Sequence, residues 1–257
     1  MPDVQHAQAA EWQVAPWPRA QVSDDGTHHV VNGSPLYAGR FDLVREFHEP
    51  GLAPARDRSG AFHINADGIP AYTHRFVEAW GFYDGLAAVH ERETGWLHVR
   101  TDGSPLSTER YGWCGNFQER RCVVRGMDGL YGHVDINGRR LSALGYLYAG
   151  DYREGAAAVR YVDDALCGHV DAAGHPLHAR RFIDLDVFHK GYARARDTRG
   201  WFHVARDGRD AYSERFANVE PFYNGTAFAE TLSGDRVLIT TDGAIARLIA
   251  GRQRIGH

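Results

Sequence analysis

The stretch Gly200-Trp201-Phe202-His203-Val204-Ala205-Arg206-Asp207-Gly208 decides the fold. It is an apolar-rich segment of strand length that ends in Asp-Gly, the strongest short signal for a β-hairpin turn. Versions of this segment recur along the whole chain, at residues 27–33, 61–68, 96–103, 131–138, 167–174 and 237–243. A pattern that repeats in this way predicts a protein built from copies of one small unit.

The turn glycines that end these segments mark the period of the repeat. Successive glycines are about 35 residues apart, which is typical of repeat proteins. We number the copies one to seven by these residues: Gly33, Gly68, Gly103, Gly138, Gly174, Gly208 and Gly243.

Each copy is expected to contain three strands and a connector. The first strand alternates small residues, as at residues 85–90 and 155–160. The second carries a histidine and ends at the turn glycine, and a brief third strand follows, as at residues 69–72. Between about residues 17 and 250 we expect seven strands of each kind and six connectors. The connector is long enough to supply a fourth strand.

The connectors carry two aromatic residues at fixed positions. The first aromatic lies eight residues after the turn glycine: Phe41, Phe76, Tyr111, Tyr146, Phe182 and Phe216. The second lies six residues further on: Phe47, Phe82, Phe117, Tyr152, Phe188 and Phe222. No segment has the period of a long amphipathic helix, so the pattern indicates an all-β protein.

Small sheets in an array must hide their end faces, by caps or by closing into a ring. The chain shows no cap-like C-terminus, which favours a β-propeller of about seven small blades. An open β-solenoid of the same repeats is the alternative. We expect a single repeat domain at residues 17–250, an N-terminal tail at residues 1–16 and a C-terminal tail at residues 251–257.

The composition indicates a soluble cytoplasmic protein. The 257 residues include 29 basic and 33 acidic side chains, and Lys190 is the only lysine. This balance implies no nucleic-acid or membrane partner. Three cysteines (Cys114, Cys122 and Cys167) lack metal-type spacing and indicate a reducing compartment. The N-terminus has no apolar signal segment. We expect no cofactor, no metal and a monomer.

Several segments resemble the WG-repeat family, also called KWG repeats. Phe82 followed by Gly85-Leu86-Ala87-Ala88-Val89 matches the Phe-x-Glu-Gly-Leu-Ala-x-Val part of that repeat, and residues 131–135 match its aromatic-Gly-aromatic-aliphatic signature. The similarity covers nearly the whole chain. It implies a bacterial repeat protein with no general activity. The chain departs from the family where histidine replaces the second aromatic of the signature in six copies.

The repeat stacks one histidine per copy at this position: His28, His63, His98, His133, His169 and His203, with Leu238 in copy seven. A ring of imidazoles lining a channel would bind metal or move protons. The alternative is structural, with each histidine on a middle strand and hydrogen-bonded to a neighbouring turn or carbonyl. We favour the structural interpretation, because a middle-strand ring is too wide for metal ligation.

Arginines recur at two positions of the repeat. One set precedes the first connector aromatic: Arg40, Arg75, Arg110, Arg181 and Arg215, with Gly145 breaking the series. The other ends the first strands: Arg56, Arg125, Arg160 and Arg196, with His90 and Glu230 in corresponding places. Strands one and three run the same way, so both sets should emerge on one face. This face would capture a carboxylate or phosphate, unless the arginines pair locally with acidic residues.

Residues that break the repeat supply candidates for chemistry. Asp184, Asp186, His189 and Lys190 cluster in one connector and its exit turn, and such a group can support acid–base catalysis. Solvated loop charges are the alternative. The sequence has no nucleophile elbow, phosphate loop or zinc motif.

The sequence therefore favours a binding module for a small anionic ligand or a protein partner. A small lyase, cyclase or isomerase that uses histidine and arginine at a channel mouth is the second hypothesis. A lectin with several equal aromatic pockets is the third. Fold analogy does not choose among them.

Overall fold

The computed structural model describes residues 17–141 and 145–251. Apart from a single turn of 3₁₀ helix, η1 (Trp17–Arg19), the regular elements of this part of the chain are β-strands. The predicted all-β class is confirmed. No helix in the described residues is long and apolar enough to cross a membrane. The predicted tails, apart from Gly251, lie outside the described residues.

The chain divides into two units, residues 1–92 with 99–104 and residues 93–98 with 105–257. The strands form seven small sheets within the described residues, one for each copy of the repeat. Sheets one to three contain β1 (Gln21–Val22), β2 (His29–Val31), β3 (Ser34–Pro35), β4 (Leu43–Val44), β5 (Ala53–Asp57), β6 (Gly60–Ile64), β7 (Glu78–Tyr83), β8 (Leu86–Glu91) and β9 (Gly95–Val99).

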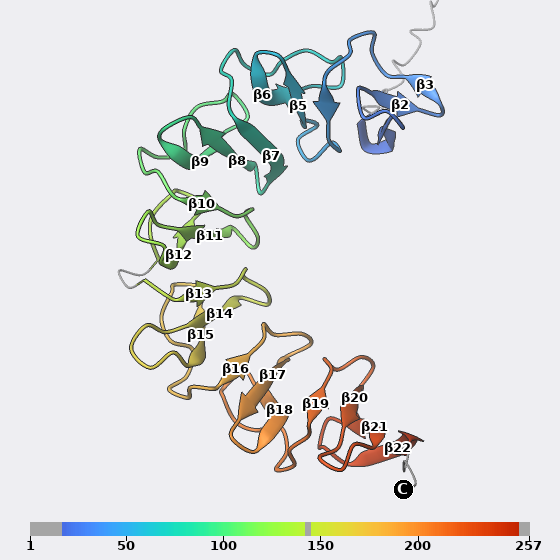
Figure 1. The fold of residues 1–257 in the computed structure, drawn as a ribbon, viewed down its shortest axis with the longest axis vertical. Coiled ribbons are helices and arrows are strands. Elements are labelled where there is room, and N and C mark those ends of the chain that lie inside the picture. The colour runs from blue at the N-terminus through green and yellow to red at the C-terminus, as the bar shows by residue number, and fades with distance from the viewer. Residues whose placement is uncertain (1–16, 142–144, 252–257) are drawn as a thin grey trace, which may run out of the picture. The chain divides into compact units, whose positions relative to one another are not determined.

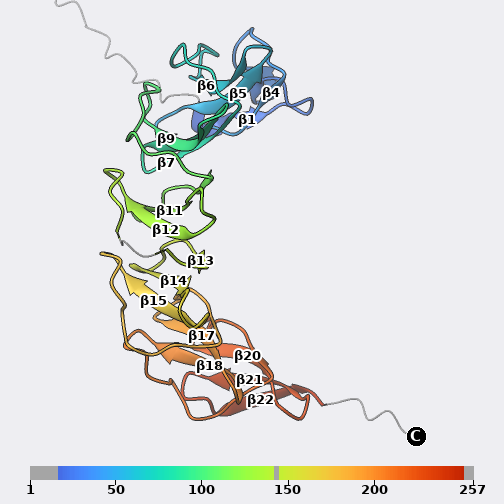
Figure 2. The ribbon, with the colours of Figure 1, turned by 60° about the vertical axis from the view of Figure 1, so that its left-hand side comes forward.

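Sheets four to seven belong to the second unit, where they follow one another in chain order (Figures 1 and 2). They contain β10 (Trp113–Cys114), β11 (Arg121–Arg125), β12 (Tyr131–Asp135), β13 (Tyr148–Ala149), β14 (Ala156–Arg160), β15 (Cys167–Asp171), β16 (Asp184–Leu185), β17 (Tyr192–Asp197), β18 (Gly200–Ala205), β19 (Asn218–Val219), β20 (Thr226–Glu230), β21 (Arg236–Thr240) and β22 (Ile245–Ala250).

The order and the number of strands within a sheet differ from the prediction. From sheet two onward the connector supplies the first strand, and the small-residue and histidine strands follow it. The expected third strand exists as β3 and β22, whereas in copies two, four, five and six it is reduced to one bridge. The prediction of seven third strands was therefore wrong. In sheets two to six the histidine strand is the last strand instead of the middle one.

The turn glycines occupy matching corners of the repeat. All seven have φ between 73° and 83°, in the left-handed region that favours glycine. In copy two, the Gly68 amide donates to the Asn65 carbonyl oxygen, while the Asn65 amide donates to Ile69. Copy one uses a shorter, two-residue turn, since Val31 pairs directly with Ser34 across Asn32 and Gly33.

The core lies between neighbouring strands of successive copies and is built from the connector aromatics. Of the twelve predicted aromatics, all except Phe41 and Phe47 are buried. The alternate small residues of the second strands are buried against them; Ala157 and Val159, for example, pack in one cluster with Tyr146 and Tyr152. The small side chains allow the close approach of the aromatic rings.

Candidate functional site

Each buried histidine joins its own copy to the next one. The Nε2 atom of His63 lies 2.7 Å from the carbonyl oxygen of Trp80, and its Nδ1 atom is hydrogen-bonded to the hydroxyl of Tyr72. Its ring packs on Phe82 with centroids 4.5 Å apart. Because a carbonyl oxygen only accepts, Nε2 carries the proton and Nδ1 accepts from the tyrosine.

The Nε2 hydrogen bond and the ring contact recur in six copies, and we call these residues the histidine ladder: His29, His63, His98, His133, His169 and His203. A tyrosine hydroxyl on Nδ1 is shared by His29, His63 and His203. Nε2 of each one donates to a carbonyl oxygen 16 or 17 residues later, at 2.7–3.0 Å. Each ring also packs on the second connector aromatic, at 4.0–4.8 Å between centroids. These contacts are structural, and they leave each imidazole between strands.

His29 belongs to the ladder in place of His28, which we had predicted. His29 is fully buried and bonds to Tyr37 and to the Arg45 carbonyl oxygen, whereas His28 interacts with Asp25 at the surface. The error follows from the shorter turn of copy one. One residue fewer separates the histidine from Gly33 than in the other copies.

Burial keeps the ladder neutral. It lowers the pKa of His63, His98, His169 and His203 to about 4 and also lowers the pKa of His29 and His133. The hydrogen bond to a carbonyl oxygen acts in the opposite direction and is outweighed by desolvation. No group of three or more metal-ligating side chains able to hold an ion occurs in residues 17–141 and 145–251.

The arginines that precede the connector aromatics have partners inside the protein. Nη1 of Arg40, Arg75, Arg110 and Arg215 donates to carbonyl oxygens of the residues just before it. Arg181 pairs with Asp163 and Asp164. Three guanidinium groups also lie over aromatic rings: Arg75 over Phe62, Arg181 over Tyr161 and Arg215 over Phe202. These side chains hold the connector against the sheet.

The arginines that end the second strands of the sheets differ from one another. Arg56 donates to the Val77 carbonyl oxygen at 2.7 Å, Arg160 to the Ala165 carbonyl oxygen at 3.4 Å, and Arg196 lies 4.0 Å from Asp184. The guanidinium of Arg125 has no hydrogen bond or ion pair with the rest of the described chain, although its backbone pairs with Trp113 and Tyr131. At the corresponding positions, His90 pairs in register with Glu78, and Glu230 lies between Asn218 and Arg236.

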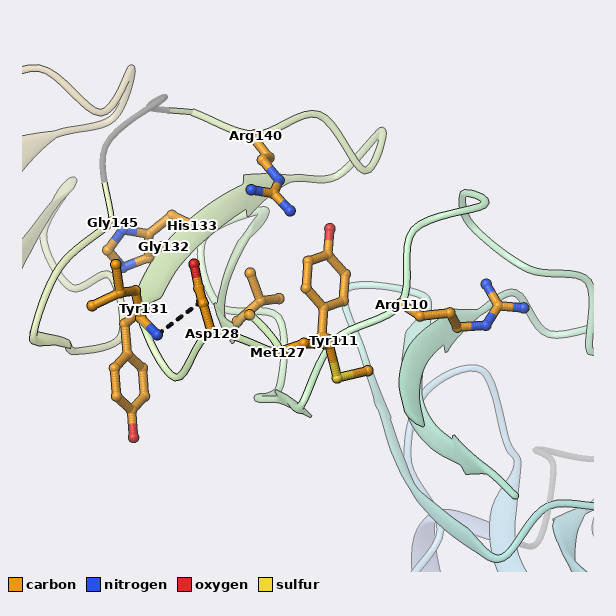
Figure 3. A pocket seen from close by; sticks show the side chains of 12 residues that line it. Arg110, Tyr111, Met127, Asp128, Tyr131, Gly132, His133, Arg140 and Gly145 are labelled. Carbon is orange, nitrogen blue, oxygen red and sulfur yellow. Dashed lines mark hydrogen bonds between the residues drawn. The ribbon is translucent and has the colours of Figure 1, made fainter. Parts of the chain in front are cut away.

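Copy four contains a pocket of about 490 Å³. Its lining includes Tyr111, Asp128, Tyr131 and Arg140 (Figure 3). Arg110 also borders it, but its side chain extends away from the other labelled residues in Figure 3. The guanidinium of Arg140 lies 6.0 Å from the ring centroid of Tyr111. Burial raises the pKa of Tyr111 to about 12, so its hydroxyl remains protonated.

Two glycines explain why the pocket lies in copy four. In copies two and six, the residue before the ladder histidine is Phe62 or Phe202, and Arg75 or Arg215 stacks on it at 3.8 or 3.5 Å. Both positions are glycine in copy four, Gly132 and Gly145, and both glycines line the pocket. A Cβ atom added at Gly132 would meet no atom within 4 Å. The pocket is thus the space beside Gly132 that a phenylalanine fills elsewhere, whereas at Gly145 a Cβ atom would meet the Leu130 side chain at 2.7 Å.

A second hollow of about 290 Å³ lies on the same sheet and shares Tyr131 with the pocket. Trp113, Arg125 and Tyr131 lie in one cross-strand row, and Tyr148 and Asp151 of the next copy complete the lining. Burial raises the pKa of Asp151. The sequence had indicated Arg125 and the break at Gly145, but Tyr111, Asp128, Tyr131 and Arg140 were missed. The paired glycines of copy four were the available signal.

The candidate acid–base residues are not brought together. Asp184 pairs in register with Arg196 near the end of β17, and Asp186 forms an ion pair with Arg194. His189 bridges to Tyr192 at the other end of that strand, and Lys190 is exposed beside it. Arg196 and Tyr192 are four residues apart, about 13 Å along a strand. Asp184 and the His-Lys pair therefore lie at opposite ends of β17, and Asp186 lies between them, opposite Arg194.

Comparison with known proteins leaves the family open. No family model matches the chain, and no curated protein is similar to it in sequence. Among solved structures, the computationally designed Ika8 protein is 13% identical with a TM-score of 0.46, and the match covers 89% of this chain and 82% of that one.

Two natural proteins give similar values. BamB from Moraxella catarrhalis is 14% identical with a TM-score of 0.45, covering 79% of this chain and 70% of its own. The WD40 β-propeller domain of Doa1 is 13% identical with a TM-score of 0.33, covering 82% and 84%. The protein is thus an all-β repeat protein of seven small sheets in its described part. None of these findings identifies the WG-repeat family.

Proposed function

We propose that the protein is a binding module that takes a small anionic, ring-bearing ligand in the pocket of copy four. The observation that carries this proposal is the pair Gly132 and Gly145. Among the six copies that have a connector, copy four is the one that has glycine at both positions. Function often breaks the symmetry of a repeat.

The shape of the pocket favours a flat ring. In copy two, the ring that fills this position, Phe62, lies 5.9 Å from the preceding connector aromatic, Phe41. The corresponding connector aromatic in copy four is Tyr111, which lines the pocket. A ligand ring can therefore pack on Tyr111 as Phe62 packs on Phe41. The volume of about 490 Å³ is in the range of small-molecule sites.

The charges favour an anionic substituent. Arg140 is largely exposed, and its ion pair with Glu109 is long, at 3.4 Å. A guanidinium in this position can bind a carboxylate or phosphate by two parallel hydrogen bonds. Arg125, in the adjoining hollow, supplies a second guanidinium without an internal partner in the described residues. Oδ1 of Asp128 accepts a hydrogen bond from the backbone amide of Leu130 at 3.0 Å.

The other hypotheses have less support. An acid–base enzyme would need Asp184, Asp186, His189 and Lys190 in one group. Instead they are spread along β17, and the carboxylate of Asp186 is paired with Arg194. A lectin with equal sites would need the same pocket in every copy, whereas this pocket depends on glycines particular to copy four.

The test is a titration followed by amide NMR shifts, with benzoate and phenyl phosphate as probes and benzyl alcohol as the uncharged control. We expect both anions to shift Gly132 and Gly145, and benzyl alcohol to bind more weakly. Gly132→Phe, which restores the side chain of copies two and six, should abolish these shifts. Unchanged binding by that variant would refute the site.

The charge component is tested with adjacent arginines. Arg140→Ala should weaken benzoate binding about tenfold, the contribution of one charge-assisted hydrogen bond. Arg139→Ala removes the same charge from an exposed neighbour that does not line the pocket, and it should leave affinity unchanged. Equal effects of the two variants would argue for general electrostatics instead of a built anion site.

We also infer that the chain is a diverged bacterial member of the WG-repeat family, that it acts in the cytoplasm and that it is a monomer. The motif around Phe82 and Gly85 supports the first inference, and three free cysteines are compatible with the second. The repeat motif in sequences of close homologues would test the family. Cell fractionation would test the location, and sedimentation would test the monomeric state.

A further inference from the structure

A second feature of the repeat binds carboxylates inside the protein. Each second strand is entered through a tight turn, and in copies five and six the two central residues are Glu154-Gly155 and Lys190-Gly191, with φ of 53° and 71° and of 53° and 81°. Two consecutive left-handed residues point both backbone N–H groups to one side, which creates an anion-binding concavity.

Both turns hold the carboxylate of the preceding copy. Oε1 and Oε2 of Glu119 accept from the amides of Glu154 and Gly155, each at 2.7 Å. Glu154 in turn accepts from the amides of Lys190 and Gly191, at 2.6 and 2.9 Å. In two copies, therefore, this turn binds a glutamate carboxylate, with one carboxylate oxygen on each of the two backbone amides.

Copy seven has the same turn but receives no carboxylate from residues 17–141 and 145–251. Asn224 and Gly225 have φ of 51° and 79°, and Tyr223 and Thr226 exchange the same pair of backbone hydrogen bonds as the flanking residues of the other two turns. The preceding copy supplies Lys190 where copies four and five supply Glu119 and Glu154. In the described part of the chain no side chain accepts from the amides of Asn224 and Gly225, and a Cβ atom at Gly225 would face open space.

We propose that the turn of copy seven, together with Lys190, is a binding site for a carboxylate from outside the chain. The ammonium of Lys190 lies 5.3 Å from the ring centroid of Tyr223, the residue that precedes the turn, so a positive charge comes from the same repeat position that supplies Glu119 and Glu154 in the earlier copies. An incoming carboxylate would take the place that Glu119 and Glu154 occupy in the earlier turns. Its source is a glutamate or aspartate side chain of another protein, or a free carboxylate anion.

The experiment follows the amide NMR shifts of the full-length protein during titration with three probes: the blocked peptide Gly-Glu-Gly, its Gly-Gln-Gly counterpart and acetate. We expect the glutamate peptide and acetate to shift Asn224 and Gly225 without shifting Gly191, and the glutamine peptide to have no effect. Tighter binding of the peptide than of acetate would indicate a protein side chain, and equal binding a free anion. Absence of any shift at Asn224 and Gly225 would overturn the proposal.

Two exchanges between copies make the test specific. Lys190→Glu should fill the turn from within and abolish binding, while Lys190→Gln should weaken it about threefold, as expected for one exposed charge. Glu154→Gln should open the preceding turn, so that the amides of Lys190 and Gly191 begin to respond to the glutamate peptide. Binding that survives Lys190→Glu would also overturn the proposal. Binding in the pocket of copy four is followed by the amide shifts of Gly132 and Gly145. These are separate signals from those of Asn224 and Gly225, so either proposal can fail without the other.

Discussion

The imidazole of His203 lies between the hydroxyl of Tyr212, 2.6 Å from Nδ1, and the carbonyl oxygen of Glu220, 2.9 Å from Nε2. One side chain thus ties a turn of its own copy to the first strand of the next copy. Since copies contact their neighbours through such links, the ladder stabilises the repeat array at each junction.

We expect His203→Leu to destabilise the second unit by about 2 to 3 kcal/mol, although leucine occupies this position in copy seven. The substitution leaves the Glu220 carbonyl oxygen and the Tyr212 hydroxyl buried without partners. Urea unfolding measures the effect. Tyr212→Phe, which removes a single hydrogen bond, should cost about 1 kcal/mol. A cost below about 0.5 kcal/mol for His203→Leu would show that the ladder is dispensable.

Stability should fall steeply on acidification between pH 6.5 and pH 4. Burial lowers the pKa of four ladder histidines from 6.5 to about 4, so in this window the unfolded chain binds more protons than the folded chain. Stability is therefore complete above pH 6.5 and is lost as the pH approaches 4. Urea midpoints at pH 7.5, 6 and 5 measure the slope. A midpoint independent of pH would contradict the neutral ladder.

Filling the pocket should stabilise the protein. Gly132→Phe adds a buried ring to a space where its Cβ atom meets nothing, and we expect a gain of about 1 to 2 kcal/mol. The matched substitution Gly168→Phe falls at the same repeat position in copy five, where a Cβ atom would lie 2.8 Å from the Tyr161 ring. It should destabilise instead. Thermal melts of the two variants give the comparison, and shifts of the same sign would contradict the assignment of the pocket.

Arg215 should be far more important to stability than its charge alone suggests. Its side chain is 4% exposed, lies over Phe202 and pairs with Asp197 and Asp210. Arg215→Ala should cost about 3 kcal/mol, because it removes a buried guanidinium that packs on Phe202 and takes one arginine partner from each of two carboxylates. Arg209→Ala breaks an exposed pair with Asp207 and should leave the unfolding midpoint nearly unchanged. Similar unfolding midpoints for both variants would refute a structural role for this arginine set.

The three cysteine thiols should not react with a thiol reagent in the native protein. Cys114, Cys122 and Cys167 are buried, and burial raises the pKa of all three. Since the thiolate is the reactive form, a disulfide reagent should label none of them until urea unfolds the chain. Fast labelling of any cysteine before unfolding would show that its strand opens readily.

Local patterns identified much of the fold. The turn glycines, the histidine strands and the small-residue strands were predicted correctly, because turn chemistry and strand alternation depend on neighbouring residues. His29 was misassigned because a two-residue turn shortens copy one. The third strands were overpredicted because the segment after the turn glycine leaves the sheet early: in copies two, four, five and six it makes one bridge instead of a ladder.

The candidate site could not be predicted from the sequence, because it depends on tertiary contacts. That Gly145 breaks the arginine series is visible in the sequence, but its meaning depends on knowing that Arg75 and Arg215 stack on Phe62 and Phe202. The same holds for Glu119 and Glu154. From the sequence they are ordinary charged loop residues, and only the structure shows that their carboxylates accept hydrogen bonds from the turn of the next copy.

The sequence by itself determined the all-β class, the period and the places where the chain turns, since these follow from φ preferences and alternation within a few residues. Only the tertiary structure decided which charged side chains have internal partners and where a pocket remains. The physical reason is that partners from successive copies lie 16 to 37 residues apart along the chain. Which of them meet is set by the packing of one sheet on the next.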